Sequence, residues 1–149
     1  MVIFSPGWFM PASDSPSNTE GLTTIPSRFG PREMMDRLET EIRAHGLSVF
    51  ARIDHAAGAA EVGLTLRPTN LIIFGNARGG TPLMQAAQKV GIDLPLKALV
   101  WEDAASKTWI SYNEPNWIAQ RHSSNVGTEI VNKLTVTLAA IAKAAGQNQ

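Results

Sequence analysis

The strongest constraint on this fold is an almost wholly apolar run at residues 70–75, which leads into a glycine turn. A short run of this kind is typical of a central strand covered on both faces. Thr81 and Pro82 follow the turn and predict a helix with Thr81 as N-cap and Pro82 in its first turn. That helix is expected to stop at Val90-Gly91. The centre of the chain is therefore predicted to be a buried strand that feeds a helix.

Periodicity and helix signals predict further elements on both sides of this strand. Helices are expected at residues 31–46, 81–91, 113–122 and 127–145, and strands at residues 22–25, 47–54, 96–102 and 107–112. Gly46 is the expected stop of the first helix, and Asn113 is the expected cap of the third, with Pro115 in its first turn. This order predicts an α+β two-layer sandwich, a mostly antiparallel sheet with helices on one face.

The composition fits one folded domain and excludes several classes of protein. The chain has 149 residues, of which 44% are hydrophobic and 17% charged, as in ordinary globular proteins. Thirteen basic residues balance thirteen acidic ones, so no strong field would attract nucleic acid or an anionic membrane. Without cysteine there is no disulfide, thiolate metal site or cysteine nucleophile. We expect a single domain over residues 21–149, with neither a nucleic-acid nor a membrane partner.

Residues 1–20 differ in character from the rest of the chain. Their apolar start, which includes Phe4, Trp8 and Phe9, is interrupted by Pro6-Gly7 and has no preceding basic residue, unlike a secretory signal. We therefore expect a cytoplasmic protein. Residues 11–19 are typical of a flexible link, so the segment is interpreted as a flexible tail. The alternative is that its aromatic residues dock on an apolar patch of the same or a neighbouring subunit.

The predicted sheet leaves one face to be covered. If Val49 and Ile73 point toward the helices, then Phe50, Ile72 and Phe74 point away from them. A large apolar patch on a soluble protein usually marks an interface or a binding site. A second copy of the chain, the N-terminal segment or a ligand could cover it. We favour a homodimer, because symmetric pairs are the commonest oligomers.

The glycine turn offers a candidate site for a small ligand. Unpaired N–H groups at a helix start, the helix dipole and Arg78 could together hold an anion. The phosphate-loop pattern needs lysine where Gly80 stands, so a nucleotide triphosphatase is excluded. A simpler interpretation is that the glycines only allow the turn and Thr81 only caps the helix. The candidate ligand-binding residues are Asn76, Arg78, Gly79, Gly80, Thr81 and Arg67.

Aromatic residues on the two last strands suggest a second kind of ligand. Trp101, Trp109 and Tyr112 could wall a pocket for a planar molecule, although aromatic residues on strands often simply pack.

Three residues are the candidates for catalysis. Strand alternation places His55 at the end of the core-facing row, where it would be a core-edge imidazole or a general base. Glu61 would approach it only if the intervening loop folds back. His122, beside Arg121, suits a helix C-terminus without any ligand. The sequence contains neither a closely spaced metal motif nor a Gly-x-Ser-x-Gly elbow, so no metal ligand, cofactor or reaction is assigned.

Several motifs together carry a resemblance to a known family. They are Phe-Gly-Asn at residues 74–76, Gly-Thr-Pro-Leu-Met at 80–84, Asp-Leu-Pro at 93–95, and the stretches 50–59 and 66–69. Over about residues 22–145 the chain resembles family 302 of the domains of unknown function, found in bacteria and archaea. The resemblance implies a β-α-β4-α arrangement like that of TATA-binding-protein-like folds, here with an inserted helix. It also implies a homodimer, and it implies no activity.

Three hypotheses for function follow. The first is a homodimeric module that binds or senses a small anionic or planar molecule near the glycine turn. The second is an enzyme that uses His55 as general base or metal ligand, assisted by Glu61 or His122. The third is an interaction domain whose apolar sheet face only assembles subunits.

Overall fold

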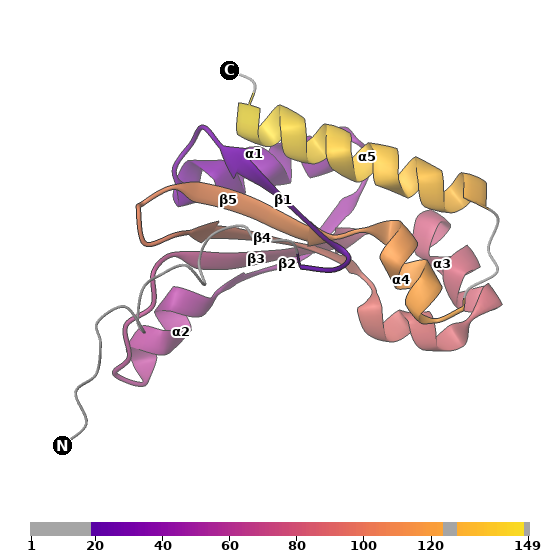
Figure 1. Ribbon diagram of the computed structural model, residues 1–149, viewed down its shortest axis with the longest axis horizontal. Helices are drawn as coiled ribbons and strands as arrows, with labels where there is room; N and C mark the ends of the chain where they lie inside the picture. Colours follow the sequence, from indigo (N-terminus) through magenta and orange to yellow (C-terminus); the bar gives the residue numbers. More distant parts are fainter. Residues whose placement is uncertain (1–18, 124–127, 148–149) are drawn as a thin grey trace.

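The fold is an antiparallel sheet with two long helices on one face (Figure 1). A computed structural model describes residues 19–123 and 128–147. The strand order is β1-β5-β4-β3-β2, and every neighbouring pair is antiparallel. The strands are β1 (Leu22–Ser27), β2 (Ser48–Asp54), β3 (Thr69–Gly75), β4 (Leu96–Glu102) and β5 (Thr108–Asn113). The helices are α1 (Pro31–Ala44), α2 (His55–Glu61), α3 (Ala77–Ala86), the 3-10 helix η3 (Gln88–Asp93), α4 (Pro115–Arg121) and α5 (Thr128–Gln147). The expected α+β sandwich is confirmed.

The core lies between the sheet and the pair α1 and α5, which run side by side in Figure 1. Each helix turns an apolar stripe toward the sheet, as its spacing predicts. These stripes include Met34, Met35, Leu38 and Ile42 of α1, and Val131, Leu138, Ile141 and Ala145 of α5. The sheet contributes Ile72, Phe74, Val100 and Ile110, all buried. Helix α1 ends before Gly46, whose φ of +77° suits glycine, so the expected stop is confirmed.

A β-bulge in β2 decides which side chains face this core. Val49 pairs with Phe74 and Ala51 pairs with Ile73, so Phe50 is the extra residue between them. Phe74 is 1% exposed and faces the helices, whereas Phe50 is 58% exposed. The expectation that Ile72 and Phe74 point away from the helices is therefore wrong. In an apolar run that is covered on both faces, no alternation with polar residues shows which side chains face the helices. A bulge in the neighbouring strand cannot be recognised from the sequence either.

The opposite face of the sheet, called here the outer face, is apolar too, but with other residues than expected. The cross-strand pairs place six large apolar side chains on it, in three neighbouring rows: Ile53, Leu71, Ile73, Leu99, Trp101 and Trp109. Ile53 is 40% exposed, and the rings of Trp101 and Trp109 stack with centroids 6.3 Å apart. The sequence predicts an apolar sheet face that another molecule or segment covers. The outer face is such an apolar surface, although other residues form it.

Helix α3 begins earlier than predicted. Asn76 is its N-cap, and the Asn76 Oδ1 accepts a 2.8 Å hydrogen bond from the Gly79 N–H. Thr81 is therefore not the cap, and Pro82 lies inside the helix. The helix also stops at Ala86, and the remainder of the predicted helix forms η3. The prediction favoured Thr-Pro as a start signal, although an asparagine at a strand end is an equally strong cap.

Two other helices show the limits of the pattern. Helix α2 was expected to be strand end and loop; Asp54 caps it by accepting a 2.9 Å bond from the Ala57 N–H. It buries no residue, so it has no apolar stripe that a sequence could display. Helix α4 has Pro115 in its first turn as predicted, but its N-cap is Glu114, while Asn113 ends β5. The expectations for Phe4, Trp8, Phe9 and the flexible tail lie outside the described residues.

Candidate functional site

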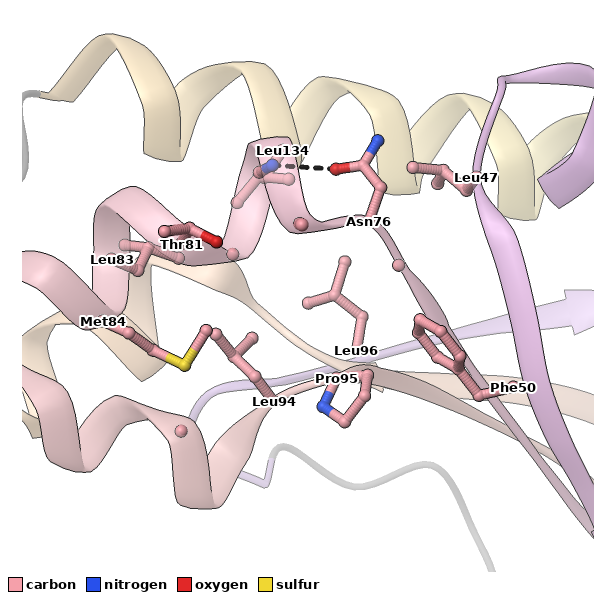
Figure 2. Close-up of a pocket in the computed structure, with 15 residues that line it drawn as sticks. Leu47, Phe50, Asn76, Thr81, Leu83, Met84, Leu94, Pro95, Leu96 and Leu134 are labelled. Carbon is pink, nitrogen blue, oxygen red and sulfur yellow. Dashed lines mark hydrogen bonds between the residues drawn. The ribbon is translucent and has the colours of Figure 1, made fainter.

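A cavity of about 350 Å³ lies where β3 and β4 meet the glycine turn. It is bounded by α3, by η3 and by one side chain of α5, Leu134, and Phe50 of the β2 bulge stands beside it (Figure 2). The walls come from segments far apart in the sequence, which the sheet register brings together. The volume falls within the range of small-molecule pockets, about 300–1,000 Å³.

The lining of this cavity is almost entirely apolar. Its side chains are mostly aliphatic, with one aromatic ring and two polar groups: Leu47, Leu83, Leu94, Leu96, Leu134, Ala77, Met84, Pro95, Phe50, Asn76 and Thr81. Glycine backbone completes the wall at Gly75, Gly79, Gly80 and Gly91. Of the described residues that line the cavity, none carries a charge. The described lining therefore presents mainly apolar surface to the cavity.

Four of the predicted ligand-binding residues line the cavity: Asn76, Gly79, Gly80 and Thr81. The two predicted cations do not. Arg78 is exposed on α3, and Arg67 lies at the other end of the sheet, where its Nε donates to the Glu102 carbonyl at 3.2 Å. The sequence predicted a site at the glycine turn with both arginines in it, whereas the structure has a cavity at the turn and both arginines outside its lining.

The predicted catalytic residues are dispersed. His55 is exposed at the start of α2 and Glu61 ends that helix, whereas His122 follows α4 at the opposite end of the sheet (Figure 1). The expectation of a partly buried His55 on a core-facing row is wrong, because the strand ends at Asp54 and a helix begins. In the described parts of the chain, no three carboxylate or imidazole side chains gather to hold a metal ion.

His122 instead belongs to a polar cluster that the sequence did not predict. Its Nε2 lies 2.5 Å from Asp93 Oδ2, and Arg121 donates to both carboxylate oxygens of Asp93 at 3.0 and 2.9 Å. Burial raises the pKa of Asp93, but the His122 hydrogen bond and the charges of Arg121 and His122 lower it by more, so the net pKa lies below the usual range.

This cluster ties the cavity wall to the rest of the domain. Asp93 ends η3, and Leu94 and Pro95, which line the cavity, follow it directly. The cluster thus fastens the end of η3 to α4. Residues 93 and 121–122 lie 28 and 29 positions apart, and no local spacing rule could have paired them.

The proposed aromatic wall does not form. Trp101 and Trp109 stack on the outer face, where the Trp101 Nε1 donates to the Ser111 hydroxyl at 2.9 Å. Tyr112 belongs to the buried core on the other face, and burial raises the pKa of its phenol. None of these three residues lines the cavity.

Asp103 supports the hairpin that carries the tryptophans. Its carboxylate accepts 2.9 Å bonds from the Trp109 Nε1 and from the Ala105 and Lys107 backbone N–H groups. The indole hydrogen bond, followed by the backbone bonds, lowers the pKa of Asp103. Its role is structural, because every one of these donors belongs to the hairpin itself.

Comparison with solved structures supports the fold. A crystal structure of an uncharacterised conserved DUF302 protein from Bacillus stearothermophilus superposes with a TM-score of 0.77 and 21% sequence identity. The superposition covers 85% of this chain and 99% of that one.

The helices of the described residues were also compared with the length and hydropathy of a membrane span, and none of them is sufficiently long and apolar.

Curated relatives are more similar in sequence but considerably longer. Proteins named fluoride-specific ion channel FluC 1, from Brucella suis biovar 1 and Brucella abortus biovar 1, are each 47% identical to the chain over 117 residues. That stretch is 78% of this chain but 46% and 43% of the respective relatives. The chain thus matches less than half the length of these proteins.

The family assignment comes from a match over most of the domain. The model of the family described as "Domain of unknown function DUF302" matches residues 23–144, from the first strand nearly to the end of α5. The motifs that suggested this family lie within the matched region, and those at residues 74–76, 80–84 and 93–95 contribute to the lining of the cavity. This chain is a member of the DUF302 family.

Proposed function

We propose that this domain is a small-molecule binding or sensing module and that the ligand occupies the cavity at the glycine turn. The observation that carries the proposal is the cavity itself, about 350 Å³ of largely apolar space beside α3. Empty apolar space costs stability, because the atoms around it lose packing partners. A binding function explains why such space is kept beside the core.

The glycines around the cavity support this proposal. A Cβ at Gly80 would lie 3.5 Å from Leu94 Cδ1 and 3.8 Å from Met84 Cε, which are ordinary contact distances. An alanine would therefore fit there, and it would favour the helix by about 1 kcal/mol. Glycine at this position keeps the space beside Leu94 and Met84 open at the cost of helix stability.

An enzymatic function receives less support. His55, Glu61 and His122 are distributed over both ends of the sheet, and His122 already has Asp93 as a partner. General acid–base catalysis needs groups within hydrogen-bond reach of one substrate. The cavity offers no titratable side chain among its described lining residues.

We further propose that the working unit is a homodimer that buries the outer face. Ile73, Leu99 and their neighbours form an apolar patch in the middle of this face, flanked by the stacked tryptophans. A second copy offers the same patch, and a twofold axis would bring the two together. This arrangement would leave the α1 and α5 layer exposed to solvent on both subunits.

The cavity is tested by filling it. In Gly80→Leu the new side chain would extend between Leu94 and Met84. Gly58→Leu in α2 is the matched control, because nothing lies within 4 Å of a Cβ built there. Native and denaturing mass spectrometry of the purified proteins, followed by a metabolite screen by thermal shift, would detect a ligand.

We expect wild type and Gly58→Leu to carry or bind the same compound and Gly80→Leu to lose it. Since the leucine fills existing space, the melting temperature of ligand-free Gly80→Leu should equal or exceed that of wild type. A compound that stabilises all three proteins equally binds elsewhere. A screen in which no compound binds wild type contradicts the binding function.

The names of the curated relatives favour a second candidate function, fluoride sensing. The similarity of 47% over 117 residues indicates that the Brucella channel proteins contain this domain. The amides of Ala77 and Arg78, at the start of α3, have no intrahelical acceptor and could receive a small anion. An NMR titration with sodium fluoride should then shift these two amides, and sodium chloride should not. Equal responses to both salts contradict fluoride sensing.

A further inference from the structure

We propose that the ligand is an uncharged, mainly apolar molecule that places one hydrogen-bonding group against the Thr81 hydroxyl. This inference rests on the proposed binding function and names the chemistry of its ligand. It departs from the anion expected at a glycine turn, because the structure shows what surrounds the ligand space.

The absence of charge in the wall is the first argument. The described lining residues offer neither a cation for an anion nor a carboxylate for a cation. A charged group without a partner loses its hydration and gains nothing in return, which costs far more than burying a neutral group. Arg78 is close in sequence, but it is exposed on α3 and does not line the cavity.

The aliphatic wall of the cavity favours a ligand whose larger part is apolar. Leu83 and Leu96, which are buried, line it together with Leu94 and Leu134, which are partly buried (Figure 2). An engineered apolar cavity of about 150 Å³ holds benzene, so this larger space admits a substituted ring or a short branched chain. Met84 lines the same space, and its flexible side chain can adapt to the shape of either.

The Thr81 hydroxyl is the group that we expect to bind the polar end of the ligand. Asn76 also lines the cavity, but its Oδ1 is engaged by the Gly79 N–H, and in Figure 2 its amide nitrogen points toward α5. Among the described residues, no hydrogen bond uses the Thr81 hydroxyl, whereas the hydroxyls of Thr40 and Thr135 bond to their own helices. A hydroxyl both donates and accepts, so it suits a neutral alcohol, carbonyl or amide.

Thr81 also explains where the polar group lies. The residue is exposed, so its hydroxyl stands at the mouth of the cavity rather than at the base. The apolar part of the ligand would be buried against the leucines, while the polar part meets Thr81 at the rim. This arrangement orients the ligand without burying an unpaired polar group.

A set of probes of one size and different charge tests the inference. Toluene, benzyl alcohol, benzoate and benzylammonium would be titrated into folded ¹⁵N-labelled protein, with the amides of Gly75, Gly80 and Gly91 reporting on the cavity wall. The variant is Thr81→Val, which keeps the shape and removes the hydroxyl. Thr40→Val is its matched control, since Thr40 is an exposed helical threonine outside the cavity.

We expect toluene and benzyl alcohol to shift these amides, with both charged probes at least about tenfold weaker. Thr81→Val should weaken benzyl alcohol about threefold to tenfold and leave toluene unchanged, because one hydrogen bond is lost. Thr40→Val should change neither.

Each other outcome overturns the inference in a distinct way. Benzoate or benzylammonium binding as tightly as benzyl alcohol excludes an uncharged ligand, yet leaves the binding function intact. Equal effects of Thr81→Val on toluene and benzyl alcohol exclude the hydroxyl contact. If no probe moves the wall amides, the apolar ligand class is excluded, and the Gly80→Leu experiment decides separately whether the domain binds anything.

Discussion

The two faces of the sheet carry similar amounts of apolar side chain but have different surroundings. On one face, Ile72 and Phe74 are buried beneath α1 and α5. On the other, Ile73 and Leu99 belong to a surface that these helices do not reach. Hydrophobic residues on both faces therefore do not mean that both faces belong to one core. The helical face forms the core of the domain, and the outer face is the surface that we propose a second copy covers.

The cavity lies where the two faces meet. Phe50, displaced outward by the bulge, lines the cavity and is 58% exposed, while Leu83 on the far wall is buried. The cavity wall therefore combines buried residues of the core with exposed residues. This suits a binding site, because a ligand needs an ordered surface and a route of entry.

The largest expected effect comes from truncating isoleucine on the helical face. Ile72→Ala should lower the free energy of unfolding by about 2–5 kcal/mol, because it removes buried methyl groups and leaves a cavity. Ile73→Ala is the matched variant on the outer face of the same strand, and its effect should be smaller in the monomer. Urea unfolding measures both. Equal losses at low protein concentration would remove the distinction between the faces.

The next effect is on assembly. Leu99→Lys places a charge in the middle of the outer face and should raise the dissociation constant of the dimer about a hundredfold. Sedimentation equilibrium would measure it. Val136→Lys is the control, because Val136 is 68% exposed on α5, away from the outer face. A wild-type protein that is monomeric at high concentration, or a dimer indifferent to Leu99→Lys, contradicts the proposed interface.

A smaller effect should come from the carboxylate that fastens the cavity wall. Asp93→Asn should cost about 1–2 kcal/mol near neutral pH, since charged hydrogen bonds from Arg121 and His122 are weakened. The pKa of Asp93 is lowered in the folded state, so its stabilisation is complete above its usual range and is lost as the pH falls through the lowered value.

The difference between wild type and Asp93→Asn should therefore be present near pH 7 and vanish as the pH falls through the lowered pKa of Asp93. Urea midpoints at a series of pH values would show this. If the stability difference between the two proteins stays constant on acidification, the charge of Asp93 does not contribute to the stability of the polar cluster.

The smallest effect concerns the polar part of the outer face. Ser111→Ala removes the acceptor of the Trp101 indole N–H and the partner of the Thr24 hydroxyl, at 2.9 and 2.8 Å. We expect a loss of about 1 kcal/mol in urea unfolding and a shift of tryptophan fluorescence. An unchanged spectrum would show that solvent replaces the serine, and that this part of the face is more open than the structure indicates.

By itself, the sequence determined the class of fold and most of the elements, and it predicted a candidate site at the segment that lines the cavity. Periodicity of 2 and of 3.6 residues marked the strands and the long helices, because burial on one side leaves that pattern wherever the other side meets water. The motifs around residues 74–84 also identified the family and the region of the cavity. Local signals of this kind are readable without knowing which segments become neighbours.

Only the tertiary structure decided what local patterns do not contain. The bulge at Phe50 paired Val49 with Phe74 and Ala51 with Ile73, and Asn76 rather than Thr81 capped α3. The polar cluster of Asp93, Arg121 and His122 joins segments that are distant in the sequence. The apolar lining of the cavity, which does not include Arg78, also comes from several such segments. Strand register, the choice of helix cap and contacts between distant segments depend on the free energy of the whole packed molecule. A single stretch of sequence does not contain that information.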